Sequence, residues 1–164
     1  MSRPVSEALL WLFVINLGIA LGAGLYEHLI VIPEWLATSP SGTHWHADAA
    51  QRFDTGRRFW AFVTTGPLTL ITLANLFGAW RSSGAVRGYW LAAALMALAD
   101  RLLTFAYFIP TMIGLLAAGD SPEAVANATT WSNLNYVRHL TVFAALLLAL
   151  KAFAVFQRTA QDGR

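Results

Sequence analysis

Four stretches of the chain are apolar over the length that a membrane-spanning helix needs. They cover residues 8–35, 59–80, 89–116 and 131–156, and about 20 predominantly apolar residues are enough to cross the hydrocarbon core. Tryptophans lie at or near the ends of these stretches, where indole rings meet the membrane–water interface: Trp11, Trp35, Trp60, Trp80, Trp90 and Trp131. The pattern predicts an all-α integral membrane protein. We expect a single four-helix bundle domain over residues 1–164, with an up-down-up-down topology.

Polar residues fall on one face of each predicted helix. Their spacing follows the helical repeat: Asn16, Glu27 and Glu34; Thr65, Thr69, Thr72 and Asn75; Asp100, Thr104, Tyr107 and Thr111; Asn135 and Arg138, with His139 a quarter-turn away. Lipid forces such faces inward, so a polar interior is expected. Most of these groups fall in the outer halves of the helices, beneath the long loop 37–58. The sequence therefore predicts a pocket that opens toward the outer face, with this loop above it.

Composition and loop charge support a membrane protein and indicate its orientation. Residues are 57% hydrophobic and only 12% charged, against roughly 25% charged in soluble domains. Basic residues in the loops and toward the span ends favour one side: Arg3, Arg81, Arg87, Lys151, Arg158 and Arg164, against Arg52, Arg57 and Arg58. The positive-inside rule then puts both termini in the cytoplasm, and a bacterial inner membrane is expected. The basic residues form no run, so nucleic acid is not an expected partner.

A cleaved signal peptide is the alternative interpretation of the N-terminal stretch. The apolar run is longer than a usual signal-peptide core, and no clear A-x-A cleavage site follows it. The connection 118–131 is expected to be a loop with one helical turn, capped by Ser121 or Asp120. Gly18 and Gly22 form a G-x-x-x-G pattern that predicts close helix packing. Pro67 and Pro110, inside spans, predict local kinks.

Four ionisable residues fall within the spans and need partners there. An unpaired charge in hydrocarbon costs several kcal/mol. Two acids and two arginines balance, so we expect ion pairs of Glu27 with Arg138, and of Asp100 with Arg101 or Arg138. Arg101 points away from the face of Asp100, so it is also expected to pack at another interface. Such pairs either hold the helices in register or belong to a functional site.

The four histidines leave metal binding open as a minor alternative. His44 and His46 form an H-x-H, and His28 and His139 are inside spans. They could ligate iron, copper or zinc, or a haem between His28 and His139. No helix carries a ligand pair at E-x-x-H spacing, and the chain has no cysteine. No cofactor is therefore expected, and an imidazole that bonds an acid is the favoured interpretation.

Two short motifs resemble the anthrone-oxygenase-like family of small four-helix membrane proteins. The first helix ends in GAGLYEHLIVIPEW, a cluster of small, aromatic and polar residues followed by proline. The last helix opens with WSNLNYVRH, which contains W-x-x-x-N-x-x-R as Trp131, Asn135 and Arg138. The resemblance extends to length and span layout over nearly the whole chain. It implies oxidation of an anthrone carbon by dioxygen without an organic cofactor.

That chemistry assigns roles to the polar residues as expectations. Glu27, His28 or His139 would remove a proton from the acidic methylene, and Arg138 would stabilise the enolate oxygen by charge. Substrate-binding residues would surround the flat ring, by stacking or by hydrogen bonds: Tyr26, Trp45, Asp100, Tyr107, Trp131 and Asn135. The catalytic set is therefore Glu27, His28, Arg138 and His139.

Three functions follow from the sequence, in order of preference. The first is an oxidoreductase or oxygenase-like enzyme that acts on a lipophilic aromatic or quinone-like molecule. The second is a non-enzymatic module that binds or moves a small molecule or proton, or supports a partner subunit. The third is a metal- or haem-bearing electron-transfer subunit. The expected partners are the lipid bilayer and the small molecule, and a homodimer is an open alternative.

Overall fold

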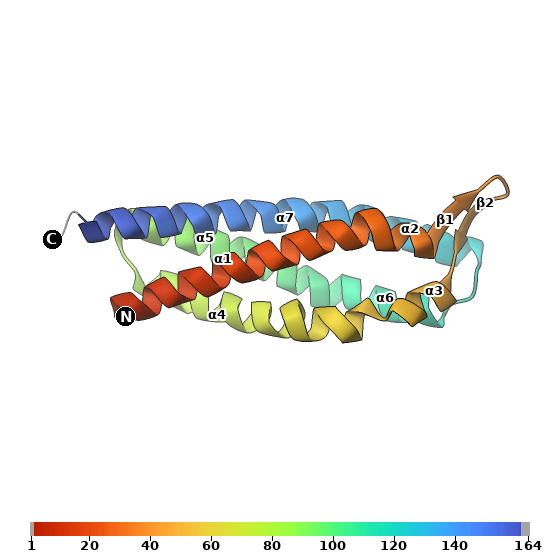
Figure 1. Cartoon of the computed structure of the whole chain (residues 1–164), viewed down its shortest axis with the longest axis horizontal. Coiled ribbons are helices and arrows are strands. Elements are labelled where there is room, and N and C mark those ends of the chain that lie inside the picture. The colour runs from red at the N-terminus through yellow and green to blue at the C-terminus, as the bar shows by residue number, and fades with distance from the viewer. Residues whose placement is uncertain (1, 162–164) are drawn as a thin grey trace.

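Four long helical stretches dominate the structure, a computed structural model that describes residues 2–161. They cover Arg3–Trp35, Gly56–Arg81, Gly84–Ala117 and Pro122–Thr159, and each is long and apolar enough to cross a membrane. This confirms that four long apolar helices form. Both chain ends lie at one end of the molecule, the terminal end, and a hairpin lies at the other, the hairpin end (Figure 1). Arg164, counted above for orientation, lies outside the described residues.

The stretches are built from α-helices and π-helical segments. In chain order the elements are α1 (Arg3–Tyr26), η1 (Glu27–Val31), α2 (Ile32–Trp35), β1 (Leu36–Ser39), β2 (Gly42–Trp45), α3 (Ala47–Phe53), η2 (Gly56–Thr65), α4 (Gly66–Arg81), α5 (Gly84–Leu103), η3 (Thr104–Phe108), α6 (Ile109–Ala117) and α7 (Pro122–Gln161). The fourth stretch thus begins nine residues earlier than the sequence pattern predicts. The connection expected over 118–131 shrinks to residues 118–121, and Ser121 Oγ caps the helix by accepting the Ala124 N–H at 3.1 Å.

Each π-helical segment is followed by a proline in the first turn of the next α-helix. Pro33 follows η1, Pro67 follows η2 and Pro110 follows η3. Proline has no N–H to donate and its ring clashes with the carbonyl four residues back. A wider π turn is one way to relieve that clash inside a continuing helix. The three prolines therefore account for irregular backbone in three of the four long stretches.

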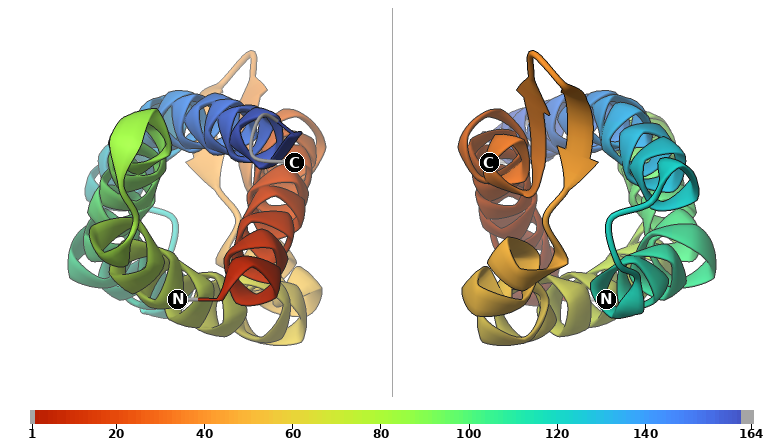
Figure 2. Two further views of the ribbon diagram at one scale, coloured as in Figure 1. Left: turned by 90° about the vertical axis from the view of Figure 1, so that its left-hand side faces the viewer. Right: turned by 90° about the vertical axis from the view of Figure 1, so that its right-hand side faces the viewer.

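Small residues let the helices approach one another toward the terminal end. α7 packs against α1 and α5, and α4 packs against α1 and α5, so the four helices form a closed ring (Figure 2). The inner surfaces of α5 and α7 carry fully buried alanines: Ala93, Ala94, Ala97, Ala145 and Ala149. Phe13 and Leu17 of α1 fill the same core. The interior of this half is therefore largely apolar, which corrects the expectation of a polar interior throughout.

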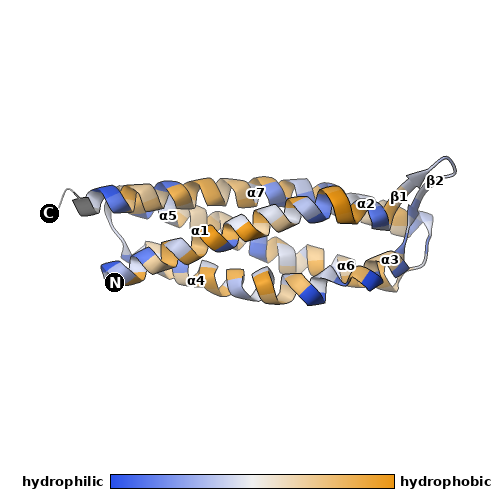
Figure 3. Cartoon of the chain, viewed as in Figure 1, coloured by the Kyte–Doolittle hydropathy of each residue, from blue (hydrophilic) through white to orange (hydrophobic). Residues whose placement is uncertain are grey.

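The G-x-x-x-G pattern does not mediate packing within this chain. A Cβ added to Gly18 or Gly22 would meet nothing within 4 Å, whereas one added to Gly24 would lie 2.9 Å from Cε1 of His139. The close approach of α7 to α1 therefore requires a glycine at position 24. The outer surface is rich in exposed apolar side chains such as Phe62, Leu70 and Phe77, and hydrophilic residues concentrate toward the ends (Figure 3).

The long loop expected over 37–58 is an ordered covering at the hairpin end. β1 and β2 pair antiparallel, with Leu36 opposite Trp45. Trp45 is buried and its Nε1 donates to the Leu115 carbonyl at 2.9 Å. Asp120, which precedes α7, accepts hydrogen bonds from the Trp45 backbone N–H (3.0 Å) and from the His44 ring at Nδ1 (2.8 Å). The hairpin is therefore fastened to the connection between α6 and α7.

Acidic pH should weaken the hydrogen bonds between Asp120 and the hairpin. The Trp45 N–H, followed by the His44 ring, holds the pKa of Asp120 below its ordinary value. A carboxyl with a lowered pKa contributes stability above its unfolded pKa of about 3.9, and that contribution is lost as pH falls through the lower folded pKa. The protection factor of the Trp45 amide in hydrogen exchange should therefore fall at acidic pH.

The variant Asp120→Asn supplies the control, because it cannot carry the charge that these donors favour. Its Trp45 protection factor should be low already at neutral pH and should change little on acidification. Equal protection in both proteins at every pH would contradict the role given to Asp120.

Candidate functional site

A cavity of about 830 Å³ lies in the hairpin half of the molecule, within the size range of small-ligand sites, about 300–1,000 Å³. All three π-helical segments contribute to its wall, together with α3, α6 and α7. The residues around it are Glu27, Trp35, Ala50, Gln51, Asp54, Thr55, Gly56, Arg57, Trp60, Ala61, Thr65, Thr104, Phe108, Ile109, Met112, Ile113, Leu116, Ala117, Trp131 and Arg138. Aromatic and aliphatic side chains supply most of the wall, and its charged residues are Glu27, Asp54, Arg57 and Arg138.

The carboxylate of Glu27 is held by two neutral donors. Its Oε1 accepts hydrogen bonds from Thr55 Oγ1 at 2.5 Å and from Trp60 Nε1 at 2.8 Å. Thr55 precedes η2 and Trp60 belongs to it, so the second helical stretch positions an acid on the first. Both bonds fall on Oε1, which leaves Oε2 available to a ligand.

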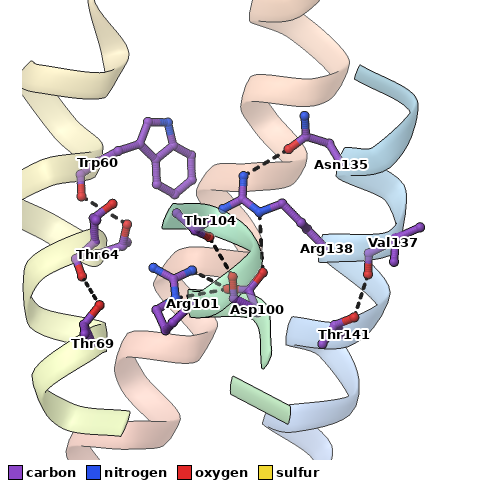
Figure 4. Close-up of polar contacts among 11 residues, drawn as sticks. Trp60, Thr64, Thr69, Asp100, Arg101, Thr104, Asn135, Val137, Arg138 and Thr141 are labelled. Carbon is purple, nitrogen blue, oxygen red and sulfur yellow. Dashed lines mark hydrogen bonds and ion pairs between the residues drawn. The ribbon is translucent and has the colours of Figure 1, made fainter. Parts of the chain in front are cut away.

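The guanidinium of Arg138 is fixed from two sides. Its Nε donates to Asp100 Oδ1 at 3.4 Å and its Nη1 to Asn135 Oδ1 at 3.1 Å, while Cζ lies 4.4 Å from the centre of the Phe108 ring. Figure 4 shows the remaining terminal nitrogen directed away from α7, on the side where Trp60 lies. A donor of fixed orientation is thus presented to the cavity.

Asp100 binds a second arginine as well. Arg101 Nε donates to Asp100 Oδ2 at 3.1 Å, and Arg101 Nη2 contacts the same oxygen. Both side chains are almost completely buried. The expectation that Arg101 packs at a separate interface is therefore wrong: its long side chain turns back to the neighbouring carboxylate, because a buried guanidinium without a counter-ion is far more costly.

The expected ion pair between Glu27 and Arg138 does not form. Among residues 2–161 the buried ion pairs are those of Asp100 with the two arginines, and Glu27 is satisfied by a hydroxyl and an indole instead. Glu27 and Arg138 nevertheless border the same cavity. The two groups therefore face a common space without neutralising each other by direct contact.

The histidines lie in two separate pairs. His28 and His139 are in edge-to-face contact, with ring centres 5.4 Å apart, and neither borders the cavity. This contact leaves no space for a porphyrin between the rings. His44 and His46 lie on the hairpin and at its end, where His44 bonds Asp120. Within the described residues no three His, Asp or Glu side chains come together at metal-binding distances.

The predicted substrate-binding residues are dispersed. Trp131 borders the cavity and its Nε1 donates to the Phe108 carbonyl at 3.1 Å. Tyr26 is 62% exposed on the outer surface, and Tyr107 borders a different hollow, beside α7. Trp45 packs beneath the hairpin and does not border the cavity.

Asp100 and Asn135 bond to Arg138 and orient it, and neither borders the cavity itself.

Sequence reasoning missed Trp35 and Trp60, since both served only as markers of span ends. Trp35 is 2% exposed, borders the cavity and has an Nε1 with no hydrogen-bond partner. A buried indole N–H without a partner is costly, and the Nε1 atom itself is not accessible from the cavity, so Trp35 contributes the apolar face of its ring to the wall.

Comparison of the chain with protein-family models, with curated proteins and with solved structures gave no match.

Removal of the Asp100 charge should destabilise the protein strongly. In Asp100→Asn two buried arginines lose their shared counter-ion, and breaking a buried pair in this way costs about 3–5 kcal/mol. Thermal unfolding in detergent measures the loss. The matched control is Asp54→Asn, because Asp54 pairs at 3.0 Å with an 88% exposed arginine and such pairs contribute about 0–1 kcal/mol. Equal melting temperatures for the two variants would contradict this account.

Proposed function

We propose that the protein is a membrane-embedded oxidoreductase, similar in its chemistry to anthrone oxygenases, that acts on a lipophilic aromatic or quinone-like molecule. One observation carries the proposal: an apolar-walled cavity contains a carboxylate, Glu27, and a guanidinium, Arg138, that are not paired with each other. The first can accept a proton and the second can stabilise an oxyanion.

In this proposal the chain crosses the bilayer four times in an up-down-up-down arrangement with both termini in the cytoplasm. Four long apolar helices and an outer surface with many exposed large hydrophobic side chains support insertion, since such a surface is unusual for a protein in water. The two chain ends lie at the same end of the molecule (Figure 1), as an even number of crossings requires. The loop arginines favour a cytoplasmic side for that end.

The wall of the cavity suits a flat, largely apolar molecule. Phe108 and Trp131 lie in edge contact, with ring centres 5.9 Å apart, and Met112 and Leu116 extend the apolar surface. Four charged groups border the cavity: Asp54 and Arg57 pair with each other beside α3, which leaves the Glu27 carboxylate and the Arg138 guanidinium as the charged groups not paired with a charged group in the same wall. A molecule with one or two oxygens on a fused ring matches this distribution, because an oxygen can reach the Arg138 guanidinium while the ring displaces water from the wall.

Proton transfer from the ligand to Glu27 leaves the total charge of the cavity and its ligand unchanged. Glu27 and Asp100 balance Arg101 and Arg138 when all four are ionised. If Glu27 removes a proton from the methylene of an anthrone, which is conjugated with the carbonyl through the fused rings, the negative charge moves from the carboxylate to the enolate oxygen, and the total stays the same. Arg138 then stabilises the enolate oxygen from a position already fixed by Asp100 and Asn135.

Dioxygen supplies the oxidant in the proposed reaction. The enolate carbon forms a bond to oxygen, and loss of water from the resulting hydroperoxide leaves a carbonyl. The methylene loses four electrons, and dioxygen accepts them: one oxygen atom enters the product and the other leaves as water. Glu27 returns its proton to the peroxide, and the second C–H proton of the former methylene leaves with the departing hydroxide as water.

A binding protein without catalysis is the second candidate. The ion pairs of Asp100 favour it, because they also serve simply to hold α5 against α7. The same cavity would then bind the molecule and release it unchanged, so turnover separates the two candidates.

Glu27→Gln and Arg138→Ala should each lower turnover sharply. A general base contributes about 10²–10⁴-fold, and one oxyanion donor about 10²–10³-fold. Oxygen uptake with anthrone as the substrate, measured on protein in lipid vesicles, gives the rates. Glu34→Gln is the control, since Glu34 lies on the same helical stretch but is exposed and does not border the cavity. Folded variants that keep the rate of the unaltered protein would refute the assigned roles.

A further inference from the structure

The cavity is bordered by side chains that also lie on the outer surface of the bundle. Ile113 of α6 is 63% exposed and Ile109 is 36% exposed, and Ala61 of η2 is also exposed. All three border the cavity. A residue that belongs both to a cavity wall and to the outer surface marks the rim of an opening, so the cavity opens sideways between η2 and α6.

The opening is bounded at both ends along the helix axes. Toward the terminal end α4 packs against α5, where Asn75 Oδ1 accepts a hydrogen bond from Trp90 Nε1 at 2.8 Å. Toward the hairpin end α3 packs against both α2 and α6, and Gln51 Nε2 donates to the Leu116 carbonyl at 2.6 Å. The second and third helical stretches are therefore held together above and below the opening.

The connection into the second stretch is also fixed. Thr55 donates to Glu27 at 2.5 Å, which ties the residues after α3 to the first stretch. Together with the Gln51 bond, this places α3 as a cover across the hairpin end of the cavity. The charged and amide residues of the rim lie beside this cover: Gln51, Asp54 and Arg57. The remaining rim, Ala61, Ile109 and Ile113, is apolar.

We propose that the ligand of this cavity is dissolved in the bilayer and enters sideways, between η2 and α6, rather than from water past α3. The inference rests on the proposed function, since it takes the exposed faces of η2 and α6 to be in contact with lipid. An apolar rim imposes no dehydration cost on a lipid-dissolved molecule, whereas an ion would lose its hydration there.

This route also sets the orientation of the ligand. Glu27 and Arg138 border the cavity but are only partly exposed, whereas Ile109 and Ile113 are exposed at the rim. An oxygen on the leading edge of a flat ring reaches the two charged groups, and the apolar trailing edge stays near Ile113. The ligand class is accordingly an uncharged fused-ring ketone or quinone, with any hydrocarbon substituent on the edge away from the reacting oxygen.

Narrowing of the rim tests the route. Ala61→Trp and Ile113→Trp each place a large ring at the opening, away from the charged groups. Association of 9,10-anthraquinone with the protein in phosphatidylcholine vesicles can be followed by quenching of tryptophan fluorescence after rapid mixing. Each variant should associate about tenfold more slowly or worse, a range typical of changes in association rate. In the unaltered protein, the association rate should increase in proportion to the mole fraction of anthraquinone in the lipid.

Ala106→Trp is the matched control. Ala106 is an exposed alanine on η3 that does not border the cavity, so its variant should associate at the rate of the unaltered protein. Two rim variants from different helices keep the test decisive if one of them fails to fold. A water-confined ligand, anthraquinone-2-sulfonate, should associate far more slowly than anthraquinone.

Three outcomes would overturn the lateral route. Rim variants that associate as fast as Ala106→Trp would show that the opening is not used. Equal association of the sulfonate would show access from water. In either case Glu27 and Arg138 could still act on a bound ligand, and the oxygen-uptake assay would stand. If the unaltered protein binds no anthraquinone at all, the ligand class is wrong and the proposed function fails with the route.

Discussion

The structure depends on one carboxylate that serves two arginines. Asp100 lies almost wholly out of solvent between Arg101 and Arg138, and none of the three could remain charged there alone without a cost of several kcal/mol. Because Asp100 is on α5 and Arg138 on α7, their contact joins two helices that also share an alanine-rich core. The same contact directs the guanidinium toward the cavity. Stability and candidate chemistry therefore depend on the same ion pairs.

Irregular backbone makes the space in which this guanidinium can act. Close packing through alanines leaves little room toward the terminal end, but each of the first three stretches contains a π-helical segment shortly before a proline. Glu27, Trp60 and Thr104 all come from these segments and all border the cavity. π turns are frequent at functional sites because they displace side chains from the regular helical positions. Each π-helical segment is followed by a proline, so the three prolines help to create the irregular backbone that places these side chains at the cavity.

Hydropathy predicted the four helices because apolar runs long enough to span a bilayer dominate the sequence. Charge balance predicted the partners of Asp100, since a buried acid must find a cation. Finer geometry was out of reach. A helical wheel places Arg101 away from Asp100, yet its flexible side chain returns to it. The donors to Glu27 come from the connection into η2 and from its first turns, and no spacing rule connects these segments. The turn residues Pro40, Ser41 and Gly42 were a usable signal for the hairpin.

Tyr26 is exposed on the outer surface for the same reason that Glu27, which is partly buried, faces the cavity. The two residues are adjacent, and side chains of neighbours on a helix point in directions about 100° apart. Only one of them can face the interior, and the carboxylate has the greater need of hydrogen-bond donors. The short motif around them could not decide between the two, since both residue types suit a ligand.

A crystal structure of the protein grown from a lipid phase with 9,10-anthraquinone would test the central claim most directly. The account predicts the ring between Phe108, Met112 and Trp131, with one carbonyl oxygen within hydrogen-bond distance of Arg138 and the edge of the ring beside Glu27. A ligand bound elsewhere, or a closed cavity in which Glu27 and Arg138 pair directly, would contradict it.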